Sequence, residues 1–151
     1  MEISKIGVMG AGAMGGGIAQ LAAQAGYRVV LNDLEMSFVD KALDRIDSFL
    51  NVSIEKGKIT LEQKDQILSN FVKSTDLADF SDVDLVIEAI IEDLDLKKKA
   101  FSQLDNICKP EAFLASNTSS MSITILANAT ERPERVAGMH FFNPAPIMKL
   151  V

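Results

Sequence analysis

The single histidine of this 151-residue chain is the side chain best suited to moving a proton near neutral pH. His140 is followed by Phe141, Phe142, Asn143 and Pro144. Proline fixes its own φ, so this segment can hold both an imidazole and the Asn143 amide still. Two interpretations stay open from residue types alone, namely a general acid or base and a hydrogen-bonded histidine that ends a strand.

A second candidate for chemistry is the glycine-rich loop near the N-terminus. It follows the apolar run 3–9 and precedes the helix-like run 16–26, with the G-x-G-x-x-G spacing of dinucleotide-binding loops. The first glycine permits a tight turn, the second lets the backbone approach a diphosphate, and the third lets helix and strand pack closely. The residues of this predicted cofactor-binding loop are Gly10, Ala11, Gly12, Ala13, Met14 and Gly15.

An acidic residue occupies the position where a dinucleotide site needs one. Asp33 follows the apolar run 27–32 and lies 23 positions after Gly10. That is close to the roughly 20 positions expected for the carboxylate that binds the adenosine ribose. No Arg or Lys occurs at positions 34–39 to bind a 2′-phosphate, so NAD is favoured over NADP. The alternative is a glycine-rich helix start with an aspartate that caps a turn.

Length and composition favour one globular domain over residues 1–151, with no predicted metal site. The formal charge of −6 argues against nucleic acid as a partner, because phosphate binding requires a basic surface. The uncharged run 8–27 is long enough to suggest a membrane span, but its six glycines and turn signal favour a phosphate-binding loop. Cys108 is the single cysteine, and a strand starting near Ile3 leaves no room for a signal peptide, so we expect a cytoplasmic protein.

The rest of the sequence alternates strand-like and helix-like segments. Apolar runs predict strands over 3–9, 27–32, 71–74, 84–89, 113–116 and 136–139, and helical spacing predicts helices over 16–26, 37–56, 60–69, 94–108 and 122–128. We expect Ser37 with Asp40, and Thr60 with Gln63, to form N-terminal capping boxes. The alternation predicts an α/β fold, a doubly wound, mostly parallel Rossmann-type sheet with helices on both faces.

Polar residues follow several of the expected strands. The carboxyl ends of parallel strands lie along one edge of a sheet, where ligands bind. We therefore expect the following side chains to converge: Asp33, Glu88, Glu92, Asn117, Ser119 and His140. The alternatives are solvated loop acids for Glu88 and Glu92, and a helix cap for part of the run 116–120.

Four segments together resemble the 3-hydroxyacyl-CoA dehydrogenase family, and within it the bacterial 3-hydroxybutyryl-CoA dehydrogenases most closely. They are residues 10–20, 86–92, 114–120 and 138–150, and the last two are long and specific. The resemblance implies hydride transfer between C3 of a short-chain 3-hydroxyacyl-CoA and NAD, with His140 as the catalytic base. It also implies a place in fatty-acid oxidation or butyrate-type fermentation.

The resemblance assigns roles to further residues. Ser119 would hydrogen-bond the C3 oxygen of the substrate, and Asn117 and Asn143 would line the same pocket. Glu92 and Lys97 would contact the nicotinamide half of the cofactor, which Asn117 would also touch. These assignments add a substrate pocket to the predicted edge of the sheet.

Acyl-CoA binding is the least complete part of the resemblance. Family members often place two lysines one turn apart near the CoA phosphate, and the matching positions here hold Lys56 and Val52. The resemblance therefore leaves one basic contact for CoA. The alternative for Lys56 is a solvated helix end.

The sequence ends at Val151, whereas family members continue into a glutamate that pairs with the histidine and into a helical domain that forms the dimer. We therefore expect an NAD-binding domain with little or no turnover, whose homodimer would need the longer protein. Apolar residues that the longer protein would cover should form an exposed edge that favours self-association. They are Phe141, Phe142, Ile147, Met148, Leu150 and Val151.

Other function classes stay open. A gulonate-type hydroxy-acid dehydrogenase shares the histidine, whereas a 3-hydroxyisobutyrate dehydrogenase typically uses a lysine. A crystallin-like or nucleotide-sensing relative would bind a cofactor without turnover. The segment around His140 argues against the lysine-dependent type.

Overall fold

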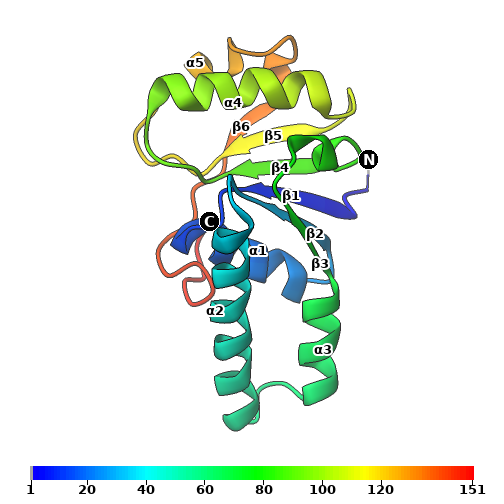
Figure 1. Ribbon diagram of the computed structural model, residues 1–151. Coiled ribbons are helices and arrows are strands. Elements are labelled where there is room, and N and C mark those ends of the chain that lie inside the picture. The colour runs from blue at the N-terminus through cyan, green and yellow to red at the C-terminus, as the bar shows by residue number, and fades with distance from the viewer. Residues whose placement is uncertain (1) are drawn as a thin grey trace.

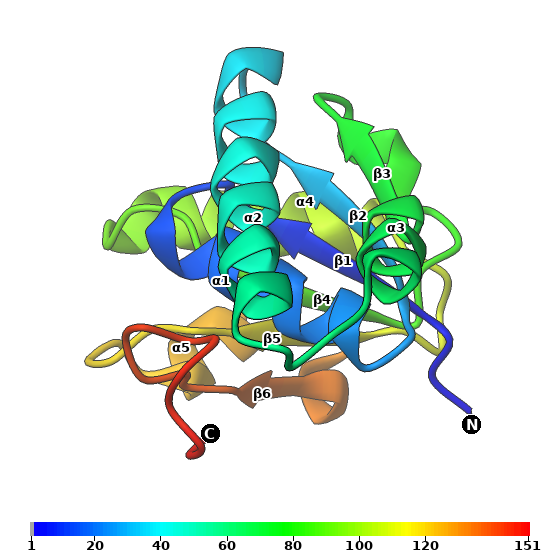
Figure 2. The ribbon, with the colours of Figure 1, turned by 90° about the horizontal axis from the view of Figure 1, so that it is seen from below.

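The computed structural model describes residues 2–151, and every strand pair found among them is parallel. The six strands form one sheet in the order β3-β2-β1-β4-β5-β6 (Figures 1 and 2). Their bounds are β1 (Lys5–Met9), β2 (Arg28–Asn32), β3 (Phe71–Ser74), β4 (Leu85–Glu88), β5 (Phe113–Ser116) and β6 (Val136–Gly138). The strand order reverses between β1 and β4, which confirms the predicted doubly wound Rossmann arrangement.

Helices cover both faces of this sheet (Figure 1). One face carries α1 (Ala13–Gln24), α2 (Met36–Glu55) and α3 (Leu61–Ser69), and the other carries α4 (Leu94–Ile107) and α5 (Ile123–Ala127). Two short 3-10 turns, η1 (Leu77–Phe80) and η2 (Pro133–Arg135), have no counterpart among the predicted elements. Within residues 2–151, none of the helices combines the length and the apolar character that a membrane crossing requires.

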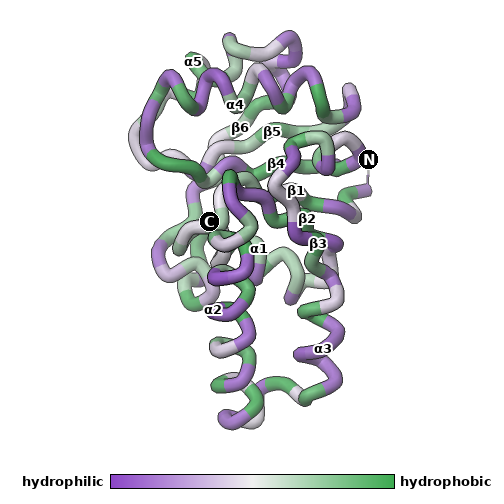
Figure 3. Tube along the Cα trace, viewed as in Figure 1, coloured by the Kyte–Doolittle hydropathy of each residue, from purple (hydrophilic) through white to green (hydrophobic). Residues whose placement is uncertain are grey.

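Each face of the sheet has its own hydrophobic core. Val29 and Leu31 of β2 belong to the core beneath α1, whereas Val30 between them belongs to the core beneath α4. This alternation follows from the two-residue period of a strand, and it explains why the strands are continuous apolar runs. The helices pack against these strands through one apolar side. Figure 3 shows the corresponding alternation of hydrophobic and hydrophilic positions along α2 and α4.

Of the two predicted N-terminal capping boxes, one is present and the other is not. Thr60 forms the predicted capping box, because its Oγ1 accepts the Gln63 N–H (3.1 Å) and Gln63 Oε1 accepts the Thr60 N–H (2.8 Å). The predicted box at Ser37 is wrong. The N-cap of α2 is Glu35, without a side-chain cap bond, because the Phe38 N–H donates to Glu35 O (3.0 Å) and starts the helix earlier.

The segment after β6 folds back onto the α1 face, where Ala145 and Pro146 lie against Gly17 of α1. Phe141 was predicted to be part of an exposed apolar edge, and that prediction is wrong: only 9% of Phe141 is exposed, because it packs with Ala145 in the core beneath α1. The rest of the predicted edge is exposed. It consists of Phe142, Ile147, Met148, Leu150 and Val151.

Candidate active site

The glycine loop between β1 and α1 has no room for side chains at two of its positions. Gly10 has a φ of +104°, and a Cβ there would lie 2.6 Å from Ala89 O. A Cβ on Gly15 would lie 1.8 Å from Gly10 O. Since real Cβ atoms do not come this close to a carbonyl oxygen, both positions require glycine. The first helical turn of α1 therefore packs directly against the end of β1.

The other side of the same loop is open. A Cβ on Gly12 would meet no atom within 4 Å, and Gly12 caps α1 without any side-chain hydrogen bond. The helix begins at Ala13 rather than near Gly16 as predicted, because the Gly16 N–H already donates to Gly12 O (2.9 Å). The N–H groups of the first turn have no partner within the helix, which makes this terminus a site for an anion. The open cradle leaves room for an anionic group at this terminus.

Asp33 follows β2 and holds the glycine loop in place. Its Oδ2 accepts the Ala11 N–H (2.6 Å), and its Oδ1 accepts the Leu34 N–H (2.7 Å). Each carboxylate oxygen keeps a further lone pair for a ligand hydroxyl. Asp33 is therefore positioned, as predicted, at the carboxyl end of β2 beside the loop.

Arg45 on α2 is part of this region, although the sequence analysis did not identify it. Its Nη2 donates to Ala11 O (3.0 Å) and lies 3.5 Å from Gly12 O. A guanidinium therefore stands at the loop that would carry the diphosphate. No local pattern in the sequence indicates this contact, because 34 residues separate Arg45 from Ala11.

His140 and Ser119 form a hydrogen-bonded pair at the carboxyl ends of β5 and β6. Ser119 Oγ lies 2.7 Å from His140 Nε2. The Phe142 ring packs against the imidazole edge to face, with the ring centroids 4.9 Å apart. Asn117 Oδ1 accepts the Phe141 N–H (2.8 Å), which fixes the backbone next to the histidine. Nε2 is therefore held facing a serine hydroxyl, an arrangement that suits proton transfer to a substrate oxygen.

A cavity of about 340 Å³ opens beside this pair. It lies between the first turn of α1 and the carboxyl ends of β4 and β5, at the reversal of strand order. Its lining residues are Met14, Ala89, Ile90, Glu92, Lys97, Asn117, Ser119 and Ser120. Glycine loop residue Met14 and Ser119 thus share one cavity, so a dinucleotide bound at the loop has space to extend toward His140.

Glu88 is not the solvated loop acid that the sequence left as an alternative. It is completely buried, and its carboxylate accepts hydrogen bonds from Lys97 Nζ (2.5 Å), Ile90 N (2.8 Å) and Ser116 Oγ (2.6 Å). Lys97 is itself only 1% exposed. A buried carboxylate and a buried ammonium thus stabilise each other at the end of β4.

Glu92 lies at the mouth of the cavity and differs from Glu88 in its exposure. Its side chain is 44% exposed, and its Oε2 lies 3.2 Å from Lys97 Nζ. Thr118 donates a hydrogen bond to the other carboxylate oxygen. Partial burial acts to raise the pKa of Glu92, but the bonds from Thr118 and Lys97 outweigh it, so the pKa lies below its ordinary value. Glu92 therefore carries a negative charge at neutral pH.

Residues 5–151 match the family model of the 3-hydroxyacyl-CoA dehydrogenase NAD-binding domain. The chain belongs to this family. The match confirms the family that four sequence segments predicted, and it accounts for the open anion cradle and the cavity beyond it.

The family's known members include close relatives of this chain. A probable 3-hydroxybutyryl-CoA dehydrogenase of Deinococcus radiodurans is 51% identical over 97% of this chain and 52% of its own length. The 3-hydroxybutyryl-CoA dehydrogenase of Clostridioides difficile is 46% identical over 97% and 52%. A crystal structure of the Escherichia coli K12 3-hydroxybutyryl-CoA dehydrogenase matches with a TM-score of 0.96 and 44% identity, over 99% of this chain and 32% of that chain. The chain thus spans about half the length of the curated relatives it matches.

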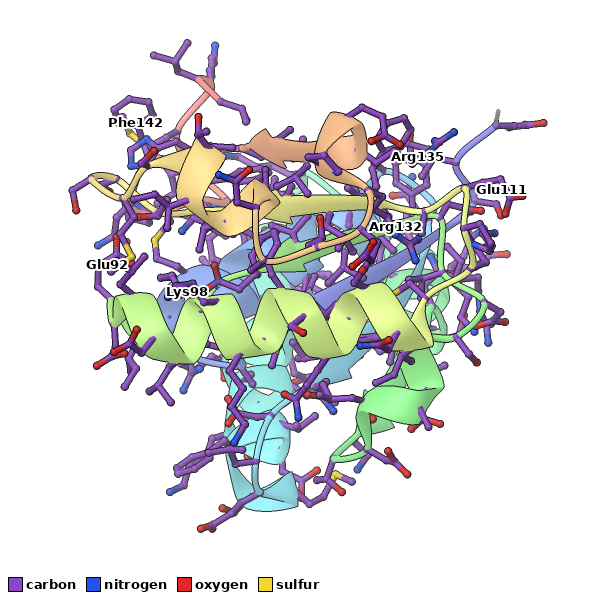
Figure 4. All side chains as sticks on the ribbon, turned by 90° about the horizontal axis from the view of Figure 1, so that it is seen from above. Glu92, Lys98, Glu111, Arg132, Arg135 and Phe142 are labelled. Atoms are coloured by element: carbon purple, nitrogen blue, oxygen red, sulfur yellow. The ribbon has the colours of Figure 1, made fainter. Side chains whose placement is uncertain are left out.

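Most predicted site residues of this family member lie at one edge of the sheet. Figure 4 shows Glu92 and Phe142 at that end, whereas Arg132, Arg135 and Glu111 lie toward the opposite end. Asn143 is exposed just beyond His140. Lys56 is not brought to the cavity: it follows the last residue of α2, and that end of α2 points away from the sheet (Figure 1). A contact of Lys56 with the CoA phosphate would therefore lie outside the cavity, on another part of the surface.

Proposed function

We propose that this chain is the NAD-binding part of a 3-hydroxybutyryl-CoA dehydrogenase, which interconverts (3S)-3-hydroxybutyryl-CoA and acetoacetyl-CoA. The observation that carries the proposal is the pair of Ser119 and His140, 2.7 Å apart, beside the cavity at the reversal of strand order. The names of the relatives support the short acyl chain.

NAD fits the residues at the glycine loop. The first-turn N–H groups of α1 would hold its diphosphate, and Asp33 would accept hydrogen bonds from the adenosine ribose. When bound, NAD supplies the nicotinamide ring that takes up or releases the hydride. We propose NAD rather than NADP because positions 34–39 contain no basic residue for a 2′-phosphate.

The side chains supply the proton chemistry. In the oxidative direction, His140 Nε2 accepts the proton of the substrate's 3-hydroxyl, and Ser119 Oγ hydrogen-bonds the same oxygen. In the reductive direction the protonated imidazole returns that proton to the forming alkoxide. Asn117 keeps the ring in place through the Phe141 N–H. General acid–base catalysis of this kind contributes about 10²–10⁴-fold to the rate.

We propose that these 151 residues by themselves bind the cofactor with little turnover. Among residues 2–151, no carboxylate forms an ion pair with His140. The imidazolium that forms in the oxidative direction therefore has no anionic partner within this part of the protein. A full catalytic site needs one from elsewhere.

The test is spectrophotometric, with acetoacetyl-CoA and NADH as substrates. We expect strong turnover from the full product of the gene, at least about a hundredfold less from its His140→Gln variant, and little from residues 1–151. Undiminished turnover of the His140→Gln variant would contradict the assigned base. Calorimetric titration should show tighter binding of NADH than of NADPH, and Asp33→Ala should weaken NADH binding.

The partners follow from the same proposal. Lys56, exposed at the outer end of α2, would contact the CoA phosphate at a distance from the cavity. We also propose that the whole protein is a homodimer, and that the exposed edge of Phe142, Ile147 and Leu150 makes residues 1–151 self-associate. Analytical ultracentrifugation should then show association that weakens in an Ile147→Glu, Leu150→Glu variant; unchanged association would contradict the role of this edge.

A further inference from the structure

Three charged side chains lie in direct contact at the carboxyl end of β4. Glu88 is completely buried and Lys97 is 1% exposed, with Nζ 2.5 Å from Glu88 Oε1. The same ammonium lies 3.2 Å from Glu92 Oε2 and 3.4 Å from Ile90 O. Burying two charges is costly, and a simple apolar pair would serve packing alone at least as well. The proposed hydride chemistry does not by itself require the buried carboxylate.

The charges differ in how they face the cavity. Glu92 and Lys97 line it, whereas Glu88 lies behind them and is not part of its surface. Glu88 is fixed by Ile90 N–H and Ser116 O–H, so it holds the ammonium at a constant place. Counting one negative charge for each glutamate and one positive charge for the lysine gives a net charge of −1 beside the cavity.

The position of this cluster identifies the half of the cofactor that it faces. Asp33 lies after β2, on one side of the reversal of strand order, and the cavity lies after β4 and β5, on the other. A dinucleotide that spans the glycine loop would therefore put its nicotinamide in the cavity, next to Ser119 and His140. The oxidised ring is a cation and the reduced ring is neutral, so a net charge beside it affects the two forms differently.

We propose that the cluster of Glu88, Lys97 and Glu92 sets the affinity of this protein for the oxidised relative to the reduced cofactor, with Glu88 as a positioning residue. The inference rests on the proposed binding of NAD. The net negative charge stabilises the cationic ring and leaves the neutral ring unaffected, so it shifts the dissociation constants in favour of NAD⁺. By thermodynamic linkage, the same charge lowers the reduction potential of the bound pair.

The central experiment removes one charge without removing volume. Glu88→Gln brings the net charge of the cluster to zero, and Lys97 keeps Glu92 as its anionic partner. A unit charge about 10 Å away, at an effective dielectric constant of about 20, changes an equilibrium by roughly tenfold or more. We therefore expect the ratio of the NAD⁺ to the NADH dissociation constant, measured by calorimetry, to rise about tenfold.

The matched control restores the charge. The double variant Glu88→Gln, Lys97→Met leaves only Glu92 charged, so its net charge is again −1, and we expect the ratio to return toward that of the unaltered chain. A merely structural role would instead weaken both cofactor forms equally in both variants. Glu92→Gln makes the same charge change at an exposed position, and it tests the inference if Glu88→Gln does not fold.

ADP-ribose lacks the nicotinamide, so its binding separates a failure of the proposed function from a failure of this inference. Failure of the unaltered chain to bind ADP-ribose or NADH would overturn the proposed function and this inference with it. Binding of ADP-ribose with unaltered affinity by the variants, together with a changed ratio, supports the inference. A ratio within twofold of the unaltered chain in Glu88→Gln or in Glu92→Gln would overturn it and leave the proposed function standing.

Discussion

Side chains of the candidate site are positioned as much by backbone groups as by one another. Asp33 accepts the Ala11 N–H and Asn117 accepts the Phe141 N–H, over sequence separations of 22 and 24 residues. Each bond ties a loop that carries one functional residue to a loop that carries another. A substitution at either acceptor therefore changes two parts of the site at once.

Arg45 provides a test at the level of a single residue. Its guanidinium bonds to Ala11 O and adds positive charge where we propose that the diphosphate binds. We expect Arg45→Ala to weaken ADP-ribose binding about tenfold, through both the lost charge and the loosened loop. Calorimetry at two salt concentrations measures this, and the loss should shrink at high salt.

Lys41 is the matched control for Arg45. It lies on the same helix, carries the same charge and is exposed, with its Nζ 6.0 Å from the centre of the Phe38 ring. Lys41→Ala should change the affinity less than twofold. Equal losses from the two variants would mean that general charge, and not the loop contact, is responsible.

At the level of single elements, local contacts could be predicted and distant ones could not. The capping box of α3 joins Thr60 to Gln63, only three positions away, and the sequence pattern identified it. The end of α4 is fixed instead by Arg132, a residue of the loop after α5, whose guanidinium donates to Asp105 Oδ1 (2.6 Å), Asp105 O (2.5 Å) and Lys109 O (2.6 Å). No pattern in the sequence relates these segments.

Arg132 should therefore be a stabilising residue of α4. Its charge-assisted bonds satisfy carbonyl groups that a helix end otherwise leaves unpaired. We expect Arg132→Ala to lower the free energy of unfolding by about 2 kcal/mol, measured by urea denaturation. Arg135 lies nearby and donates to Glu111 O (2.9 Å) in a hydrogen bond that is exposed to solvent. Its alanine variant should lose clearly less, and an equal loss would contradict the capping role.

The free energy of unfolding should depend on pH through Asp84, which accepts backbone hydrogen bonds at the start of β1. A hydrogen bond from Lys109 is the largest influence on this carboxyl and holds its pKa below the ordinary range; burial acts against it, and bonds from Ser4 and Lys5 add to the lowering. A lowered pKa means that the carboxylate stabilises the fold above its unfolded pKa of about 3.9. That stabilisation is lost as the pH falls below about 4 toward the folded pKa.

Urea denaturation from pH 7 to pH 3 measures this dependence. We expect Asp84→Asn to be destabilised at pH 7 and to lose less further stability on acidification than the unaltered chain. Asp82 provides the control, because its side chain is 67% exposed and pairs with Lys5 at the surface. If Asp82→Asn flattened the pH profile as much as Asp84→Asn, the buried carboxylate would not be the cause.

At the level of the whole molecule, the doubly wound parallel sheet, and the edge at which polar residues follow its strands, could be predicted from the sequence. A strand, a glycine loop, a helix and an acid in sequence leave few topologies, because crossovers are right-handed. The burial of Phe141 could not be predicted in this way. Its neighbour Phe142 has the same side chain and is 39% exposed, so only the fold-back of the segment onto α1 distinguishes them.

Cys108 can report on whether the domain opens as one unit. The thiol is 4% exposed, and burial raises its pKa to about 11 against the opposing charge of Arg132. It is a member of the core beneath α4, whereas the proposed cofactor site lies at the edge of the sheet. A thiol reagent at pH 8 should therefore modify Cys108 only when the core opens.

Binding of NADH should then slow the labelling of Cys108, although the thiol does not lie in the proposed cofactor site. If opening is global, NADH at one hundred times its dissociation constant stabilises the folded state by about 2.7 kcal/mol, which corresponds to roughly a hundredfold slower labelling. A thiol introduced on the exposed side of α4 by Ser102→Cys should react at once with or without NADH. If NADH left the labelling of Cys108 unchanged, the end of α4 would open by itself, and the two halves of the sheet would not unfold together.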